Sequence, residues 1–331
     1  MNHGKPDPHV SRPRKRRAHL IFNPVAGQGN AEARLFVLQD ILHPHFDLTI
    51  ELTEPDIPVE AMAQEAIAPG VDAIFAAGGD GTISGVAHAL IGTSIPLGVI
   101  PLGTANAFGA ALGIPANLEA ACQVVIEGHH QWVDTACCNG RTLILLAGIG
   151  FEAEMAERAS REAKDRLGAL AYLWAGLQQL QDQEEFQVSF CLDGQGSDLM
   201  AKAITIANAA PSTSVLAHGT GNVIADDGLL DITIAHTENR LEAFNALLQL
   251  FRSALTQIPP DRENIIGLRG KHLKIETDPP QKVVLDGEMI GTTPVEITCA
   301  PKSLRVFVPL VPEQESNLQK LLELDHAEPG T

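Results

Sequence analysis

Through about the first 130 residues, short apolar segments alternate with segments whose apolar positions have helical spacing. This alternation predicts repeated strand–helix units, which are typical of a mostly parallel sheet with helices on both faces. Loops at the carboxyl ends of such strands usually carry the ligand. The strands are expected at 18–22, 48–53, 74–77 and 97–100, and the helices at 31–42, 58–68, 83–90 and from residue 106 to 112.

After about Trp132 the pattern changes, and strand-like segments follow one another. Such a run predicts an antiparallel β-sandwich. Two helical segments, at 151–181 and 241–257, interrupt the run, and a last helix is expected at 317–324. The strands are expected at 131–136, 143–147, 186–192, 201–207, 229–235, 273–276, 282–285, 295–298 and 304–308.

Together the two patterns predict the fold class α/β plus β. A doubly wound, three-layer α/β domain is expected at 18–132, and an antiparallel β-sandwich domain with helical insertions at 133–300. Residues 1–17 are expected to form a disordered basic arm, and 301–331 a strand and helix that return to the N-terminal domain. The apolar helix expected at 167–180 fits packed core better than the border of a lipid-binding cleft.

Charge and cysteine content narrow the range of functions. The net charge of −18 over 331 residues argues against a general nucleic-acid-binding protein, because phosphate backbones require a basic face. The basic run Arg12–Arg17 fits a solubilising tail better than a weak contact with anionic membrane. The five cysteines form no Cys-x-x-Cys pair, which suits a reducing cytosol. The longest apolar stretch, Leu143–Gly150, is too short to span a bilayer, so we expect a cytoplasmic protein whose membrane contact, if any, is peripheral.

The most informative motif is the run Ala76–Thr82, which reads Ala-Ala-Gly-Gly-Asp-Gly-Thr between a strand and a helix. Three glycines allow positive φ and close backbone approach, and the first amides of the helix favour an anion. Asp80 would repel phosphate unless Mg²⁺ stood between them. The pattern is neither a Walker A loop nor a Rossmann fingerprint. It therefore indicates either a nucleotide–metal site or an ordinary turn with a capping Asp.

Four further motifs accompany this glycine turn. The loops Asn23–Gly27 and Pro101–Asn106 also follow predicted strands, so we expect all three loops at one edge of the sheet. The second half of the chain contains Asp226–Asp231 and the tripeptide Asp286-Gly287-Glu288. Taken singly, each Asp-Gly pair is also a good turn with no catalytic role.

With these five motifs in this order, the chain resembles the bacterial diacylglycerol-kinase-like lipid kinases, which share a catalytic domain with sphingosine and ceramide kinases. The resemblance extends from about Ala18 to Pro309. It implies an N-terminal domain like those of phosphofructokinase and NAD kinase. It also implies an ATP- and Mg²⁺-dependent enzyme of phospholipid metabolism that phosphorylates a hydroxyl of a diacylglycerol-like or sphingoid lipid at a membrane surface. It leaves open assembly as a homodimer.

The resemblance also implies roles for individual residues. Glu288 would be the general base that takes the proton from the lipid hydroxyl, and Asp80 would join a carboxylate–water–Mg²⁺ network near the phosphates. The Asp227 carboxylate, with main-chain oxygens near Ile224 and Leu229, would hold a structural Mg²⁺. The nucleotide would contact Asn23, Thr53, Gly79, Asp80, Gly81, Thr82, Ile83, Ser84, Gly85 and Thr104.

Two departures from the family pattern bear on these roles. The third loop of the family usually continues Asn-Asp-Phe-Ala-Arg, but this chain has Ala107 and Ala110 at the acidic and basic positions. Gly85 stands where many relatives carry Glu. Three functions therefore stay open: a lipid kinase, a NAD-kinase-like or sugar kinase, and a nucleotide-binding regulatory protein without turnover. The Asp227-Gly228 pair and Glu288 in a strand-rich second half favour the lipid kinase.

Overall fold

The computed structural model describes residues 14–67, 70–150, 185–211, 223–235 and 265–310. The helices expected at 151–181, 241–257 and 317–324 lie outside these residues, as does the apolar segment 167–180. Within the described residues, no helix is long and apolar enough to cross a membrane.

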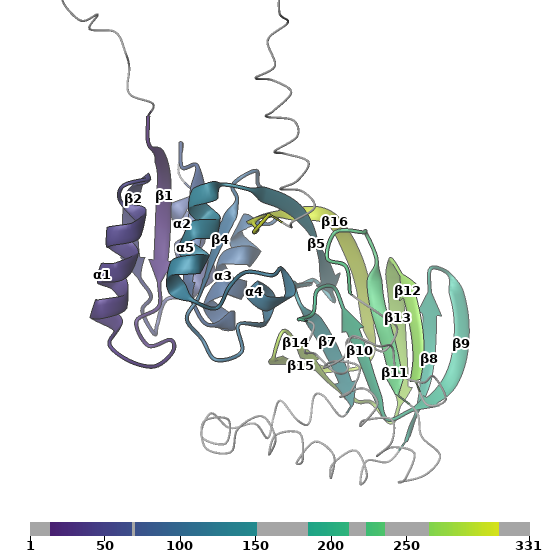
Figure 1. Ribbon diagram of the computed structural model, residues 1–331. Helices are drawn as coiled ribbons and strands as arrows, with labels where there is room; N and C mark the ends of the chain where they lie inside the picture. The colour runs from purple at the N-terminus through teal and green to yellow at the C-terminus, as the bar shows by residue number, and fades with distance from the viewer. Residues whose placement is uncertain (1–13, 68–69, 151–184, 212–222, 236–264, 311–331) are drawn as a thin grey trace, which may run out of the picture.

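The first half of the chain folds as a parallel sheet covered by helices (Figure 1). The strand order is β2-β1-β3-β4, and all three neighbouring pairs are parallel. Helices α1 and α5 pack side by side, and α2 and α3 form a second pair. The elements are β1 (Arg16–Phe22), α1 (Ala31–Leu42), β2 (Phe46–Leu52), α2 (Val59–Ala66), β3 (Ala73–Gly78), α3 (Asp80–Leu90), β4 (Leu97–Pro101), α4 (Ala107–Ala111) and α5 (Leu118–Glu127).

The second half forms two sheets that pack face to face beside the first half (Figure 1). One sheet, in the order β16-β13-β8-β9, continues directly from β4, and the other has the order β12-β11-β10-β7-β14-β15. The predicted fold class, an α/β domain with a C-terminal antiparallel β-sandwich, is therefore confirmed. The strands are β5 (His130–Cys138), β6 (Arg141–Leu143), β7 (Leu146–Gly150), β8 (Phe186–Leu192), β9 (Gln195–Ala201), β10 (Ala203–Ala207), β11 (Leu230–Ala235), β12 (Ile265–Gly270), β13 (His272–Asp278), β14 (Lys282–Leu285), β15 (Glu288–Thr292) and β16 (Val295–Phe307).

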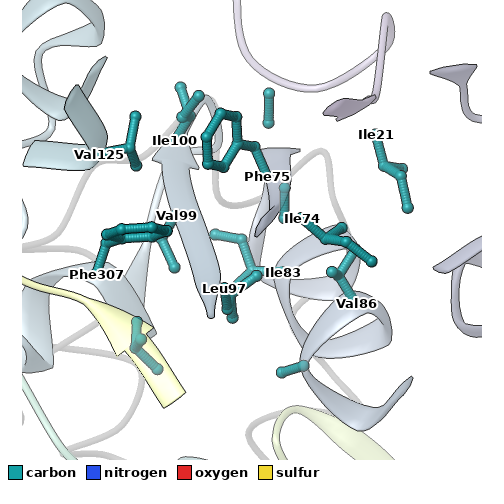
Figure 2. Close-up of a cluster of buried hydrophobic side chains, with 14 of the residues drawn as sticks. Ile21, Ile74, Phe75, Ile83, Val86, Leu97, Val99, Ile100, Val125 and Phe307 are labelled. Carbon is teal, nitrogen blue, oxygen red and sulfur yellow. The ribbon is translucent and has the colours of Figure 1, made fainter. Parts of the chain in front are cut away.

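Strand β16 belongs to both halves of the molecule. Its end pairs in parallel with β4, with Val306 opposite Leu97, while its beginning pairs with β13 of the sandwich. Phe307 enters the core of the α/β half, where its ring centroid lies 6.1 Å from that of Phe75 (Figure 2). Burial of two such aromatic rings is a large apolar contribution to stability, so the C-terminal strand helps to hold the first domain together.

Several elements differ from the sequence expectation. The strands expected at 295–298 and 304–308 are one strand, β16, with an irregularity in its pairing with β5 between Ala300 and Leu304. The strand expected at 143–147 is divided, because β6 ends at Leu143 and β7 begins at Leu146. The strands β9 and β12 and the helix α5 were not predicted.

Two residues of the basic arm expected at 1–17 belong to a strand instead. Arg16 and Arg17 are the first residues of β1 and pair with β2. The Arg16 guanidinium donates to the Ile126 carbonyl at 3.1 Å, and the Arg17 amide donates to the Asp72 carboxylate at 2.7 Å. These two charges are thus part of the folded α/β domain.

Candidate active site

The glycine turn joins β3 to α3. Helix α3 has Gly79 as its N-cap residue, and no side chain caps its first amides. A Cβ on Gly78 would lie 2.5 Å from the Thr82 side chain, so only glycine permits this approach. The helix therefore presents free amides and the positive end of its dipole at the turn, which together favour an anion.

The loop after β4 packs directly onto this turn. The Leu102 amide donates to the Gly78 carbonyl at 2.8 Å, and a Cβ on Gly103 would lie 2.8 Å from the Gly79 Cα. Asn106 has φ +48°, and its Nδ2 donates to the Gly103 carbonyl at 2.9 Å. Its Oδ1 is buried without a hydrogen-bond partner among the described residues. The glycine turn and the loop after β4 are therefore in direct backbone contact.

Asp80 ties the turn to α4. Its Oδ1 accepts a hydrogen bond of 2.6 Å from the Ala107 amide, the first amide of α4. Its Oδ2 has no hydrogen-bond partner among the residues that the structure describes. Because Mg²⁺ prefers oxygen ligands, this Oδ2 and the unpartnered Oδ1 of Asn106 fit a cation that accompanies a phosphate.

The loop after β1 completes the same edge of the sheet. The Asn23 Nδ2 donates to the Thr82 Oγ1 at 2.9 Å, and the Asn23 backbone amide donates to the Ala77 carbonyl at 2.8 Å. A Cβ on Gly27, where φ is +71°, would lie 2.0 Å from the Leu102 carbonyl oxygen. The carboxyl ends of β1, β3 and β4 thus meet, as the strand–helix pattern of the sequence led us to expect.

Not all of the expected nucleotide contacts lie at the turn. Ile83 is fully buried in the core of the α/β half (Figure 2). A Cβ on Gly85 would lie 2.9 Å from Val59, so this face of α3 packs against α2. The Ser84 Oγ lies 3.2 Å from the His88 Nε2, one helical turn away.

The two threonines expected at the nucleotide lie on loops. Thr53 follows β2, and its amide donates to the Phe22 carbonyl at 2.9 Å. Thr104 is exposed in the loop between β4 and α4.

The tripeptide Asp286-Gly287-Glu288 forms the tip of the β14–β15 hairpin. Asp286 has φ +48° and Gly287 has φ +91°, as a two-residue type I′ turn requires. The Asp286 carboxylate accepts three hydrogen bonds from successive amides, those of Ile144 at 2.8 Å, Leu145 at 2.9 Å and Leu146 at 3.0 Å. These bonds fix the hairpin to the segment between β6 and β7, and they explain why the predicted strand 143–147 is interrupted.

The pKa values around this hairpin reflect burial and charge. Burial raises the pKa of Asp286 to about 6, and the Glu288 charge adds to the rise while the three amides oppose it. Burial lowers the pKa of His88 on α3, against the opposing charges of Glu60 and Glu288. Glu288, the first residue of β15, is exposed immediately after this turn.

Asp134 is a functional candidate that the sequence analysis missed. It is only 1% exposed, and it lies on β5 opposite the irregular part of β16. Its carboxylate accepts from the Gly228 amide at 2.6 Å and from the Lys302 amide at 2.7 Å. The Asn208 Nδ2 donates to the carbonyls of Asp134 and Ile144, each at 2.9 Å. The signal available in the sequence was an acidic residue in the middle of a predicted strand, directly after Val133.

The Asp134–Asn208 pair connects the Asp227 segment to the segment that holds Asp286. Asp227 itself already has a partner for each carboxylate oxygen: Oδ1 accepts from the Leu229 amide at 3.0 Å, and Oδ2 pairs with the Arg269 guanidinium. In the described part of the chain, no three His, Cys, Asp or Glu side chains are grouped so as to hold a metal ion. As arranged, the residues around Asp227 do not fit a structural Mg²⁺.

Comparison with known proteins places this geometry in a family. Residues 17–138 match the diacylglycerol kinase catalytic domain, and residues 146–308 match the YegS C-terminal NAD kinase β-sandwich-like domain. An uncharacterized protein from Synechocystis is 50% identical over 303 residues, covering 88% of this chain and 70% of that protein. A diacylglycerol kinase from Bacillus subtilis is 29% identical, covering 89% of this chain and 97% of that protein.

Solved structures agree with these matches. A diacylglycerol kinase from Bacillus anthracis has a TM-score of 0.70 and 25% identity, covering 90% of this chain and 98% of that chain. A yeast NADH kinase shares the fold alone, with a TM-score of 0.50 and 13% identity, covering 96% of this chain and 91% of that chain.

The fold and the glycine-loop site define a kinase-type α/β domain followed by a NAD-kinase-like β-sandwich. Within that class, the chain belongs to the family of bacterial diacylglycerol-kinase-like lipid kinases. The resemblance inferred from the five sequence motifs is thereby confirmed.

Proposed function

We propose that the protein is a lipid kinase that transfers the γ-phosphate of ATP, with Mg²⁺, to a hydroxyl of a diacylglycerol-like or sphingoid lipid. The observation that carries the proposal is the meeting of three glycine-bearing loops at the N-terminus of α3, where no side chain caps the first amides. Membership of the family supports a kinase, and several relatives are named diacylglycerol kinase.

The nucleotide phosphates would lie on the amides of Gly79, Asp80 and Gly81, since the Thr82 amide already donates to the Gly79 carbonyl at 3.0 Å. Phosphoryl transfer requires positioning and charge neutralisation more than covalent help from the protein. The helix dipole and the turn amides provide part of this neutralisation. Asn23 would orient Thr82 through their hydrogen bond of 2.9 Å, and Thr53 and Thr104 would approach the nucleotide from neighbouring loops.

Mg²⁺ would supply positive charge beside the phosphates when it accompanies ATP. The chain offers two oxygens that have no partner among the described residues, the Oδ2 of Asp80 and the buried Oδ1 of Asn106. The bond from the Ala107 amide to Asp80 holds this carboxylate in place.

Glu288 would orient the acceptor hydroxyl and take its proton as transfer proceeds. The type I′ turn and the three amide bonds to Asp286 would keep the Glu288 backbone in a fixed position. Because the hairpin belongs to the β-sandwich, the lipid would enter between the sandwich and the α/β half.

A regulatory nucleotide-binding protein is a second candidate. The observation that favours it is the pair Ala107 and Ala110 on α4, which removes an acidic and a basic side chain from beside the glycine turn. A NAD-kinase-like activity has weaker support, because the yeast NADH kinase shares only the fold.

One assay separates these functions. Purified protein is incubated with labelled ATP and Mg²⁺, and with diacylglycerol, ceramide, sphingosine, NAD or a hexose, in mixed micelles for the lipids. We expect labelled phospholipid, and we expect its loss in Glu288→Gln. Label on NAD or on the hexose alone would contradict the lipid acceptor, and ATP binding without any transfer would support the regulatory protein.

A further inference from the structure

Asp227, Asp231 and Arg269 form one ion-pair cluster on the edge of the second sheet. The Arg269 Nε donates to the Asp231 Oδ1 at 2.8 Å, and its Nη2 lies 3.4 Å from the other oxygen of Asp231. The same Nη2 donates to the Asp227 Oδ2. Asp231 and Arg269 stand directly opposite each other in the pairing of β11 with β12. The two strands therefore hold the guanidinium between both carboxylates.

This cluster needs a positive charge. Asp231 is 3% exposed, and a carboxylate removed from water is costly unless it is paired. A guanidinium suits two carboxylates, because its planar set of N–H donors can bond both at once. Burial lowers the pKa of Arg269, but the bonds and charges of Asp227 and Asp231 outweigh this effect and raise it.

The guanidinium stands where the family resemblance places a structural metal. Asp227 is the carboxylate implied as the Mg²⁺ ligand, and its two oxygens are taken by Arg269 and by the Leu229 amide. The main-chain oxygen of Ala225, in the same segment, accepts from the Asp134 amide at 2.6 Å. Protein donors thus occupy the Asp227 carboxylate and the Ala225 carbonyl of this segment.

We propose that Arg269 takes the place of the structural metal in this chain, so that the fold around Asp227 does not depend on a divalent ion. The proposal is separate from the Mg²⁺ that would accompany ATP. It concerns stability, and Glu288 and the glycine turn do not enter it.

The first test compares melting temperatures in excess EDTA and in excess Mg²⁺ without nucleotide. We expect the wild type to melt at the same temperature in both. Arg269→Gln removes the charge, and we expect a melting temperature lower by on the order of 5 °C in EDTA. Mg²⁺ should restore most of that loss, because the two freed carboxylates then form an oxygen site. Lys274→Gln, which removes an exposed pairing with Glu296 at 3.4 Å, should change neither value.

Two results would overturn the proposal. One is a wild type that melts lower in EDTA and loses this sensitivity in Asp227→Asn, which would place a metal on Asp227 despite Arg269. The other is an Arg269→Gln variant that Mg²⁺ does not stabilise.

If Arg269→Gln does not fold in either buffer, Arg269→Lys keeps a cation at the position. That variant should fold and melt equally in EDTA and Mg²⁺, and a requirement for Mg²⁺ in Arg269→Lys would also count against the proposal.

Discussion

The carboxylate of Asp80 accepts a hydrogen bond of 2.6 Å from the backbone amide of Ala107. This bond joins the glycine turn to the third loop. Its donor, Ala107, stands where the family usually has an acidic side chain. A backbone amide makes this contact whatever side chain follows it. The missing carboxylate at position 107 thus leaves the position of Asp80 intact, although it removes one negative charge from the site.

We expect Asp80→Asn and Asp80→Ala each to lower turnover by on the order of a hundredfold or more, because both remove a charge from the phosphate site. Asn keeps an oxygen that can accept from Ala107, whereas Ala does not. The Ala variant should therefore also lose about 1 kcal/mol of stability, as when a helix cap is removed. Steady-state kinetics and chemical denaturation of both variants check this. Near-normal turnover in either variant at saturating Mg²⁺ would contradict the role of Asp80.

We expect Glu288→Gln to lower turnover by roughly a hundredfold or more, the usual range for a lost general base. ATP affinity and melting temperature should change little, because the Glu288 side chain is exposed and, in the proposed role, would meet the acceptor rather than the nucleotide. Glu276→Gln, at an exposed position on β13, is the matched control and should remain fully active. Full lipid phosphorylation by Glu288→Gln would show that Glu288 has no catalytic role and that Asp286-Gly287-Glu288 is only a hairpin turn.

The raised pKa of Asp286 predicts a pH dependence of stability. Asp286 in the folded protein has a pKa of about 6, whereas the ordinary pKa of an Asp carboxyl is 3.8. The protonated carboxyl therefore contributes stability that is fully present below the unfolded pKa and is lost as the pH rises through the folded pKa. Between the unfolded and the folded pKa, the free energy of unfolding should fall by about 1–3 kcal/mol.

Asp286→Asn cannot titrate, so its free energy of unfolding should vary less than that of the wild type between pH 4 and pH 6. Urea denaturation at several pH values gives the free energy of unfolding of each protein as a function of pH, and the slopes for wild type and variant are compared. Parallel curves for both proteins would show that the Asp286 pKa does not differ between the folded and unfolded states.

The basic N-terminus offers a test of membrane contact. Because Arg16 and Arg17 belong to β1, the deletion should end at residue 15, which leaves the strand whole. If the arm binds lipid, this deletion should weaken binding to anionic vesicles more than it lowers turnover in mixed micelles. Vesicle cosedimentation and micelle assays measure the two effects. Equal vesicle binding with and without residues 1–15 would leave the arm as a solubilising tail.

Local pattern predicted the four parallel strands and the helices α1 to α4, because each is short, regular and followed by a clear break, but it missed α5. Helix α1 has the predicted bounds, and Asn30 caps it through bonds to the amides of Glu32 and Ala33. The glycine loops were expected at one edge of the sheet for topological reasons, and the structure places them there. The Asp-Gly sequence at 286–287 likewise predicted its hairpin, since both residues have positive φ.

Long-range partners could not be read from the sequence. Nothing near Arg269 shows that Asp231 lies opposite it, because 38 residues and a strand pairing separate them. Asp134 and Lys302 meet across 168 residues. The expected metal role of Asp227 came from the motif alone, and a motif cannot reveal which cation the rest of the chain supplies.

The continuity of β16 limits how the two halves can move. Domains joined by a flexible linker can swing apart as rigid bodies. Here β5 and β16 run side by side from one half into the other, and their pairing is irregular only between Ala300 and Leu304, where Asp134 and the Thr135–Ser303 contact of 2.8 Å lie. Opening the space around Glu288 would therefore require the shared sheet to flex at this irregularity. The polar cluster that joins β5 to β16 at this irregularity would then both hold the two halves together and be the place where they bend.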